Sequence, residues 1–482
     1  MTAISRRDFL RSAGVGAAAL TMPGLTSGVA RSSGAGGKPN IVYILADDLG
    51  YADVGCYGQK RIGTPNIDRL AADGMKFTQH YSGNPVCAPS RCTLMTGLHT
   101  GHCQIRDNKQ VGGEEGWQLG STIGGQWPLE EGTVTVAKIL QDAGYATGAF
   151  GKWGLGRVGT AGEPGKQGFD RFYGYICQRQ AHTYYPNHLW SDDKIEWIEA
   201  NKDGKEAVYS HDLIAEEALK FIKANKNNPF FCYVPFTIPH VALQAPEDSL
   251  AEYKGKWPGP PYDGKNGYFP HENPRACYAG MVTRMDKDVG RIMSLLKELG
   301  LDKNTLAIFS SDNGPSYAGG ADAGFFESAG PLRGLKGSVY EGGIRVPFIA
   351  RWAGRIKPGS ESGHICAFWD FLPTACEIIG VEPPAGIDGI SYLPTLLGKK
   401  ENQKTHHHLY WELGGRQGIR MGDWKLVRTR PGGKIELYNL AKDIGEKNDV
   451  GKENPEILAK MTEMLTTART ESEVFPLPKP KS

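Results

Sequence analysis

Five short, almost continuously apolar runs constrain the fold of this chain more than any other feature. They span residues 40–46, 145–150, 229–234, 306–310 and 346–350. Runs of this length without polar alternation are typical of strands that are buried on both faces of a sheet. Patterns with helical periodicity lie between them, at residues 134–143, 211–224 and 278–299. The alternation predicts an α/β fold whose large, mainly parallel sheet is flanked by helices.

Polar residues follow four of the five runs, at or just beyond the point where each predicted strand ends. They are Asp47-Asp48, Gly151-Lys152, Pro239-His240 and Asp312-Asn313. The carboxyl ends of parallel strands meet at one edge of a sheet, and open α/β sheets bind their ligands there. We therefore expect three carboxylates, an amide, a lysine and an imidazole to share one cleft.

The oxygen-bearing members of this set predict a metal site. Asp47, Asp48 and Asp312 would raise one another's pKa values if they lay together without a cation to neutralise them. Hard oxygen ligands, completed by Asn313, suit Ca²⁺ or Mg²⁺ rather than Zn²⁺. For Asp47-Asp48 taken alone, a turn or a helix cap is the alternative interpretation.

The first thirty residues read as a twin-arginine export signal. Arg6-Arg7 precede a weakly apolar stretch at residues 13–20, and the small residues of Gly28-Val29-Ala30 resemble a cleavage site. The stretch is shorter than the roughly 20 apolar residues that span a bilayer, and no later segment reaches that length. We expect a signal peptide at 1–30, a linker at 31–39, and a soluble periplasmic or secreted protein without a transmembrane anchor, exported by the twin-arginine machinery.

Composition limits the remaining possibilities. The 482 residues, 40% of them hydrophobic, allow a large core, and a net charge of +2 lacks the basic excess of nucleic-acid-binding proteins, so no nucleic-acid partner is expected. Nine cysteines suit an oxidising compartment, but disulfides and free buried thiols both remain open.

The C-terminal region has a different pattern from the rest of the chain. Short alternating segments after residue 400 predict antiparallel strands, and residues 455–471 predict an amphipathic helix. We expect a catalytic α/β domain at 40–400 and a small α+β subdomain at 401–482. The run His406-His407-His408 is interpreted as a solvated loop, with a metal tract as the alternative.

One segment, Cys87-Ala88-Pro89-Ser90-Arg91, predicts the chemistry. Pro89 fits the first turn of a helix, and Ser90 and Arg91 place a hydroxyl and a guanidinium beside position 87, which favours an anion there. The segment resembles the maturation signature of type I, formylglycine-dependent sulfatases. The resemblance implies that a maturation enzyme oxidises Cys87 to formylglycine, whose hydrate attacks sulfur. A structural cysteine before an ordinary helix is the alternative.

Further blocks resemble the same family and occur in its order. They include residues 40–51, 64–71, 311–314, 332–347, 422–425 and 436–440. The resemblance thus covers nearly the whole chain after the signal and implies the sulfatase fold of the alkaline phosphatase superfamily.

The resemblance also implies a role for each matching residue. Asp47, Asp48, Asp312 and Asn313 would bind Ca²⁺ together with the modified residue 87, with Mg²⁺ as the second choice. Arg91 would orient the nucleophile, Lys152 and Lys336 would hold the sulfate oxygens, and His240 would protonate the leaving alcohol. The alternatives are ordinary solvated lysines and a buried, hydrogen-bonded histidine.

The chain departs from the family at Gly154. The family sequence after this strand is usually Gly-Lys-Trp-His-Leu-Gly, whereas this chain has Gly151-Lys152-Trp153-Gly154-Leu155-Gly156. The missing histidine is implied to help expel sulfate in the second half of the reaction. We expect His182 to fill its space and take its role, with His188 as the second candidate.

Together these features predict an enzyme that hydrolyses a sulfate monoester. A sulfated carbohydrate is the preferred substrate, because of the export signal and because many aromatic residues between Tyr173 and Trp197 suit stacking on sugars. The alternatives are a phosphonate monoester or phosphodiester hydrolase of the same superfamily and a non-catalytic sulfoglycan-binding protein.

Overall fold

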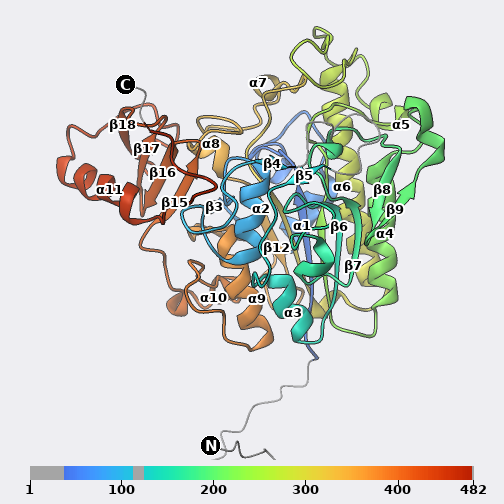
Figure 1. The fold of residues 1–482 in the computed structure, drawn as a ribbon, viewed down its shortest axis with the longest axis horizontal. Coiled ribbons are helices and arrows are strands. Elements are labelled where there is room, and N and C mark those ends of the chain that lie inside the picture. The colour runs from blue at the N-terminus through green and yellow to red at the C-terminus, as the bar shows by residue number, and fades with distance from the viewer. Residues whose placement is uncertain (1–36, 112–123, 480–482) are drawn as a thin grey trace, which may run out of the picture. The chain divides into compact units, whose positions relative to one another are not determined.

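The computed structural model describes residues 37–111 and 124–479. The predicted signal peptide at 1–30 and most of the predicted linker lie outside these residues. The described part of the chain is built around one large sheet, with a smaller sheet near the C-terminus (Figure 1).

The large sheet has a parallel centre, and most of the pairs toward its margins are antiparallel. Its strands, in spatial order, are β13 (Ser360–Ser362), β2 (Met75–Phe77), β12 (Phe348–Arg351), β11 (Thr305–Ser311), β1 (Asn40–Ala46), β10 (Phe230–Pro235), β6 (Ala146–Lys152), β7 (Arg171–Tyr175), β8 (His188–Ser191) and β9 (Lys194–Trp197). From β11 to β7 all neighbours are parallel. Four of the five predicted strands form this parallel centre.

The fifth predicted strand, β12, runs the other way. It pairs antiparallel with β11, with Phe348 opposite Ser310. The chain between β11 and β12 stays at the carboxyl edge of the sheet, so β12 begins where β11 ends.

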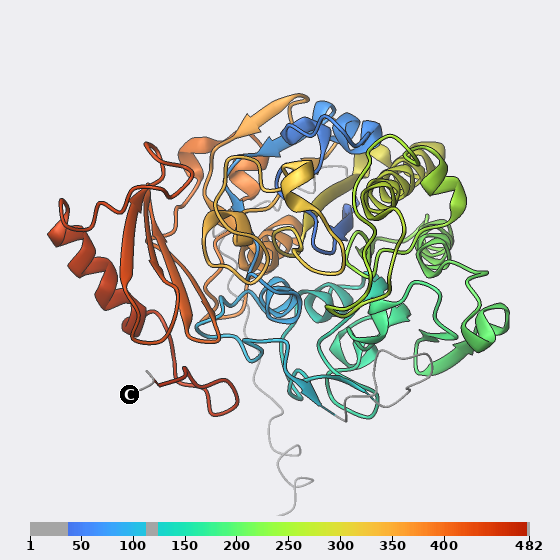
Figure 2. The same ribbon diagram turned by 90° about the horizontal axis from the view of Figure 1, so that it is seen from above.

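Helices cover both faces of the large sheet, as the uninterrupted apolar runs predict (Figure 2). Side chains of β1 alternate between two cores: Val42 and Ile44 pack on one side, and Ile41, Tyr43 and Leu45 on the other. The first core includes α1 (Pro65–Ala72), α4 (Ser210–Ala224) and α6 (Pro274–Glu298), and the second includes α2 (Cys87–Thr96), α3 (Val136–Asp142) and α9 (Phe371–Ile379).

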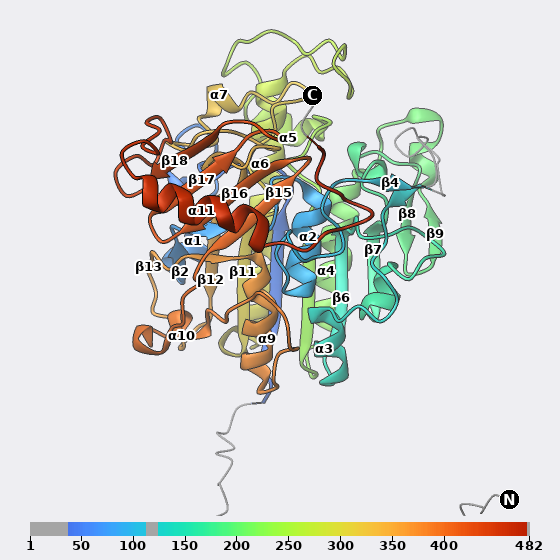
Figure 3. The ribbon, with the colours of Figure 1, turned by 60° about the vertical axis from the view of Figure 1, so that its left-hand side comes forward.

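The C-terminal sheet is antiparallel, as predicted. Its strands in order are β15 (Leu409–Leu413), β16 (Arg416–Met421), β17 (Trp424–Arg428) and β18 (Ile435–Asn439). Helix α11 (Pro455–Thr467) packs on one face through Met461 and Leu465, which contact the core of Ile419 and Leu426 (Figure 3). The fold class is therefore an α/β fold with a mainly parallel sheet and a small antiparallel sheet plus helix.

The remaining short elements connect these layers. They are β3 (His80–Tyr81), β14 (Cys366–Ala367), β4 (Gln110–Val111), β5 (Gly125–Gln126), α5 (Glu247–Ala251), α7 (Ala323–Phe326), α8 (Glu341–Ile344) and α10 (Leu393–Leu396). Within the described ranges, none of the helices combines the length and the apolar character needed to cross a bilayer. All nine cysteines lie in the described residues, and all are free thiols.

Candidate active site

The four predicted strand ends meet in one cluster at the carboxyl edge of the large sheet. Asp47 and Asp48 follow β1, Lys152 ends β6, His240 lies beyond β10, and Asp312 and Asn313 follow β11. The three aspartates, Asn313, Lys152 and His240 are all buried. With Cys87, Arg91 and Lys336 they form what we call the strand-end cluster.

Cys87 is the first residue of helix α2, and this end of the helix lies at the cluster. Ser90 braces the helix, because its Oγ donates to the backbone oxygen of Asp312 at 2.6 Å and accepts from the Gly83 amide at 3.1 Å. Cys87 Sγ lies 3.6 Å from Asp47 Oδ1 and 3.5 Å from Lys336 Nζ. Burial raises the pKa of the Cys87 thiol to about 12, so the unmodified side chain is almost entirely protonated at neutral pH and is a poor nucleophile.

Lys336 reaches the cluster on a loop that is fixed at the backbone. The Lys336 amide donates to Pro315 O at 3.0 Å, and the Gly337 amide donates to Pro85 O, just before α2, at 2.8 Å. Lys336 Nζ then lies 2.7 Å from Asp48 Oδ1. On the other side of the cluster, Lys152 Nζ lies 2.6 Å from Asp47 Oδ2. Neither lysine is an ordinary solvated side chain, since Lys152 is 1% exposed and Lys336 is 15% exposed.

Arg91 completes the balance of charge. Its Nη2 lies 2.8 Å from Asp312 Oδ2 and 3.4 Å from Asp47 Oδ2. Three carboxylates therefore face three cationic side chains. Burial would raise the pKa of Asp47, but Lys152 and the other cations hold it well below its usual value. Burial and the charge of Asp47 raise the pKa of Asp312 to about 6.

The donor set fits a hard divalent cation. One ligand atom from each of Asp47, Asp48, Cys87 and His240 can be chosen so that all four lie within 4.8 Å of one another. Asn313 Nδ2 donates to Asp48 Oδ1 at 2.7 Å, whereas Asn313 Oδ1 is buried and, within the described residues, has no hydrogen-bond partner. An unsatisfied buried amide oxygen beside two carboxylates is an available cation ligand.

Two histidines lie together at the edge of the cluster. His240 Nδ1 donates to the backbone oxygen of Val241, and His240 Nε2 lies 3.4 Å from Asp48 Oδ2. The ring of His182 stacks on that of His240, with centroids 4.8 Å apart and planes 12° apart. Burial and the positive charge of Lys152 and Lys336 lower the pKa of His182 to about 3, so its ring is neutral at neutral pH.

The side chain that lies against Gly154 is Gln178, and that His182 takes the space and the role of the missing histidine stays a prediction. Gly154 has a φ of +79°, and a Cβ there would lie only 2.6 Å from Cγ of Gln178. Gln178 Nε2 lies 3.3 Å from Asn108 Oδ1, which also accepts from the Ala88 amide of α2. The second candidate, His188, is buried in β8 against Gln180. No spacing or motif in the sequence connects Gln178 with Gly154.

The expected sugar-stacking aromatics are mostly core residues. Tyr173, Tyr175 and Tyr184 are 2%, 0% and 0% exposed and belong to the core beneath α4, whereas Trp197 is 54% exposed. The prediction that these rings face a sugar is wrong for the buried ones, because the helix layer covers them.

The histidine run is not simply solvated. His406 Nε2 lies 2.8 Å from Asp370 Oδ1 with 8% of its side chain exposed, while His407 is exposed. Burial would lower the pKa of His406, but Asp370 raises it above its usual value.

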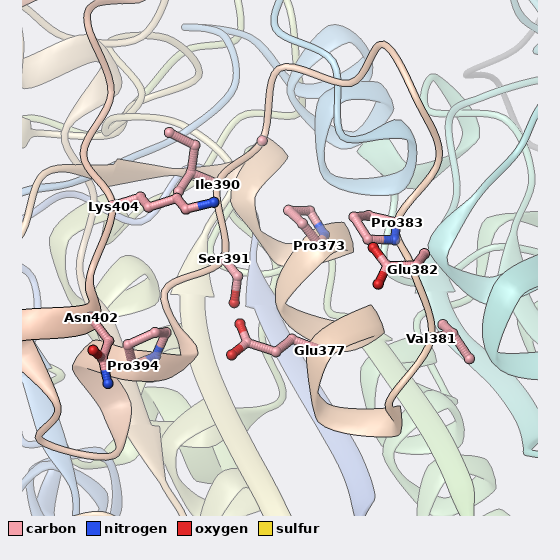
Figure 4. A pocket seen from close by; sticks show the side chains of 11 residues that line it. Pro373, Glu377, Val381, Glu382, Pro383, Ile390, Ser391, Pro394, Asn402 and Lys404 are labelled. Atoms are coloured by element: carbon pink, nitrogen blue, oxygen red, sulfur yellow. The ribbon is translucent and has the colours of Figure 1, made fainter. Parts of the chain in front are cut away.

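A cavity of about 450 Å³ lies in the same region, between α9 and residues 381–404. None of the residues of the strand-end cluster line it, and Glu377 points toward Ser391 across it (Figure 4).

Comparison with known proteins identifies the class to which this fold and site belong. The sulfatase family model matches residues 39–381, and a model described as N-sulphoglucosamine sulphohydrolase, C-terminal, matches residues 335–471. The chain is 32% identical to arylsulfatase A of Homo sapiens over 88% of its own length and 87% of that protein. It is 29% identical to an N-acetylgalactosamine-6-O-sulfatase of Bacteroides thetaiotaomicron, covering 90% and 93%.

Solved structures give the same result. The crystal structure of Ps i-CgsB in complex with k-i-k-neocarrahexaose has a TM-score of 0.74 and 30% identity, covering 89% of this chain and 92% of that one. A phosphonate monoester hydrolase of Agrobacterium radiobacter has a TM-score of 0.61 at 21% identity, covering 92% and 100%, and so shares the fold. The chain belongs to the sulfatase family, which fits the alkaline phosphatase superfamily, and it is an enzyme that hydrolyses sulfate esters.

The prediction of a twin-arginine export signal is confirmed as well. Residues 3–23 match the model of the twin-arginine translocation signal sequence, which indicates export by that route.

Proposed function

We propose that this protein is a formylglycine-dependent, Ca²⁺-dependent sulfatase that acts on a sulfated carbohydrate in the periplasm or outside the cell. The observation that carries the proposal is the placement of Cys87 at the start of α2, within 3.6 Å of a metal-type carboxylate and 3.5 Å of a lysine. A buried, protonated thiol among three carboxylates has no evident use, whereas an oxidised residue 87 would supply a hydroxyl nucleophile at the same place.

Asp47, Asp48, Asp312, Asn313 and residue 87 would hold Ca²⁺. When bound, the cation would polarise a sulfate oxygen, and formylglycine would supply the attacking hydroxyl. The side chains of the protein would carry out the remaining steps, which are sulfate binding and proton transfer.

Binding and stabilisation of the sulfate would fall to three cationic groups. Lys152 pairs with Asp47, Lys336 pairs with Asp48, and Arg91 is held by Asp312, so that all three bring positive charge to the cluster that contains residue 87. Fixed charges of this kind stabilise the charge that develops on a transferring sulfuryl group without reorganising during the reaction.

Proton transfer would be shared by the stacked histidines. His240 fixes its ring by donating from Nδ1 to Val241 O, so that Nε2 faces the cluster. Burial and the charge of Lys336 lower the pKa of His240, so Nε2 carries no proton in the free enzyme; it would take one up when the anionic ester binds and then deliver it to the leaving oxygen. His182, neutral and adjacent, would accept the proton of the residue 87 hydroxyl when sulfate leaves. Gln178 has an amide and not a base, so it supports packing at Gly154 rather than this proton transfer.

The preferred substrate class rests on the relatives and on export. Among the similar proteins are an N-acetylgalactosamine-6-O-sulfatase and a structure in complex with k-i-k-neocarrahexaose, both of them carbohydrate-related. An exported enzyme with such relatives would remove sulfate from an external polysaccharide or its fragments.

The decisive experiment is a desulfation screen with defined sulfated sugars, run alongside matched aryl sulfate and aryl phosphonate esters. Protein produced with a maturation enzyme should release sulfate from at least one sugar, and mass spectrometry should show the loss of the thiol at position 87. Faster cleavage of the phosphonate ester than of the sulfate ester would favour the phosphonate hydrolase. Full activity with an unmodified Cys87 would refute the formylglycine mechanism.

A further inference from the structure

A long loop between α5 and α6, residues 252–273, brings Tyr268 to the stacked histidines. The centroid of its ring lies 5.3 Å from that of His182 and 6.2 Å from that of His240. Burial raises the pKa of the Tyr268 phenol, and the charge of Lys336 opposes this. The side chain is half-buried.

Tyr268 is held in a backbone conformation that bulky residues avoid. Its φ is +68°, in the left-handed region where Cβ crowds the backbone. The loop around it is closed by its own contacts: Tyr262 and His271 exchange two backbone hydrogen bonds of 2.9 Å, and the Tyr262 hydroxyl donates to Gly267 O. Strain of this kind persists only where the surroundings enforce it, and it is concentrated at functional sites.

A second loop makes room for the ring. Gly319 has a φ of +60°, and a Cβ there would lie 2.7 Å from Cβ of Val241 and 3.2 Å from Cδ2 of Tyr268. The absence of a side chain at 319 therefore lets this loop close on Tyr268 and on the residue that follows His240. The loop approaches the ring at Cδ2, and the two histidines meet it at angles of 57° and 69°.

We infer that Tyr268 forms the wall of the subsite for the alcohol part of the ester, and that a sugar ring packs on it. The inference rests on the proposed role of His240, because the group bonded to the leaving oxygen must lie beside the residue that protonates that oxygen. An aromatic ring offers a flat apolar surface with little conformational freedom to lose on binding. Tyr268 would thus supply the stacking surface that the buried aromatics of β7 and β8 cannot.

The test separates the alcohol part of the substrate from its sulfate. N-Acetylgalactosamine 6-sulfate carries both, whereas inorganic sulfate, the product, has no alcohol part. Tyr268→Ala should raise the KM for the sugar sulfate by about 10-fold, with a smaller change in kcat, and should leave the Ki of inorganic sulfate within about 2-fold of wild type. An equal loss for both probes, or no change for the sugar sulfate, would overturn the inference.

Binding measurements keep this result distinct from the proposed function. In a Cys87→Ala background, calorimetry with the same two probes should show that Tyr268→Ala weakens the sugar sulfate alone, even if no turnover is found. If the Cys87→Ala protein binds no member of a sulfated-sugar panel more tightly than inorganic sulfate, the wall does not exist. Absence of desulfation with intact, Tyr268-dependent sugar binding would instead refute the catalytic proposal.

Three further variants control for loss of structure. Tyr268→Phe should retain the wild-type KM, because the ring and not the hydroxyl packs on the sugar; a loss equal to that of Tyr268→Ala would contradict this. Tyr268→Asn should share the KM defect yet melt at a higher temperature than Tyr268→Ala, because asparagine tolerates the left-handed backbone. Tyr317→Ala removes a tyrosine that is 69% exposed on the facing loop and should change neither probe.

Discussion

Two of the buried ionic clusters in the described residues differ in their exposure and in what lies beside their charges. The strand-end cluster lies at the carboxyl edge of the large sheet. The second, which we call the joint cluster, connects α8 to the C-terminal sheet through Glu341, Lys425, Arg345, Arg420 and Glu446. In it, Glu341 accepts from Tyr81 at 2.7 Å and lies 2.9 Å from Lys425 Nζ and 3.3 Å from Arg345 Nη1.

The joint cluster is shielded from solvent, whereas the strand-end cluster is partly accessible to it. Lys425 is 0% exposed and bonds only within the interior, while Lys336 is 15% exposed and lies beside the position of a nucleophile. Each cluster has a buried oxygen without a partner in the described residues, Oδ1 of Asn313 and Oε1 of Glu446, so this feature does not distinguish them. Perturbed, buried charges therefore do not identify a functional site by themselves; a nearby reactive group and an opening to solvent do.

The largest effect should come from Cys87. Cys87→Ala removes the proposed nucleophile and should lower kcat by at least about 10⁴-fold, because catalytic groups that act as a unit lose most of the rate when one is absent. Its melting temperature should change little, since the thiol makes only long contacts. A Cys92→Ala variant in the same helix is the control and should keep its activity. Residual turnover above one percent in Cys87→Ala would contradict the nucleophile assignment.

Removal of the cation should affect the strand-end cluster and not the joint cluster. Chelation should abolish activity and lower the melting temperature, since a ligand bound only to the native state at 100 times its Kd adds about 2.7 kcal/mol. Calcium should restore both. Asp48→Ala should lose the response, whereas Asp193→Ala, at an exposed aspartate, should keep it. If chelation alters neither melting nor rate, the carboxylates are balanced by the lysines and arginine alone.

His240→Ala should slow substrates with poor leaving groups by about 10²–10⁴-fold, because proton donation to the leaving oxygen is lost. A nitrophenyl sulfate, whose leaving group departs without a proton, should be affected far less. Equal losses for both would remove His240 from the role of acid.

His182→Ala provides the matched comparison within the stacked pair. It should permit a first burst of alcohol release and then stall, with sulfate retained on the protein. Rapid-quench measurement of alcohol and sulfate separately would reveal this. Unchanged steady-state turnover would exclude His182 as the base.

Lys425→Met should lower stability and leave activity unchanged, which is the reverse of the result expected for Cys87→Ala. It leaves Glu341 buried with one cation fewer, and breaking a buried pair costs about 3 kcal/mol of unfolding free energy. The activity per folded molecule should stay at the wild-type level. Denaturant unfolding and kcat measurements on the same samples check both points, with exposed Lys442→Met as the control. A loss of kcat without a loss of stability would show that the joint cluster takes part in catalysis.

The same contrast explains how far the sequence is predictive. Strand ends are local features, so Asp47, Lys152 and Asp312 could be placed together from the apolar runs and the rule that parallel strands share an edge. Tyr268 and Gln178 could not, because their positions depend on how loops distant in the sequence close over the sheet. The prediction for the buried tyrosines near residue 180 is wrong for a related reason. An aromatic residue gives the same sequence pattern whether its ring faces a sugar or a helix.

The smallest expected effect is a change in how the unfolding free energy depends on pH. It is also the most specific test of the joint cluster. Burial and the charge of Glu341 raise the pKa of Glu446 to about 8, although Lys425 and Arg333 oppose this. The folded protein therefore keeps a proton on Glu446 that the unfolded chain releases near pH 4.5, and the stabilisation is lost as pH rises from there to about 8. Glu446→Gln mimics the protonated form, so its unfolding free energy should equal that of wild type near pH 4.5 and exceed it by about 1–3 kcal/mol at pH 8. Exposed Glu453→Gln should show no such widening difference. Melting curves for the three proteins across this range provide the measurement, and parallel curves for wild type and Glu446→Gln would mean that Glu446 is ionised in the folded protein throughout.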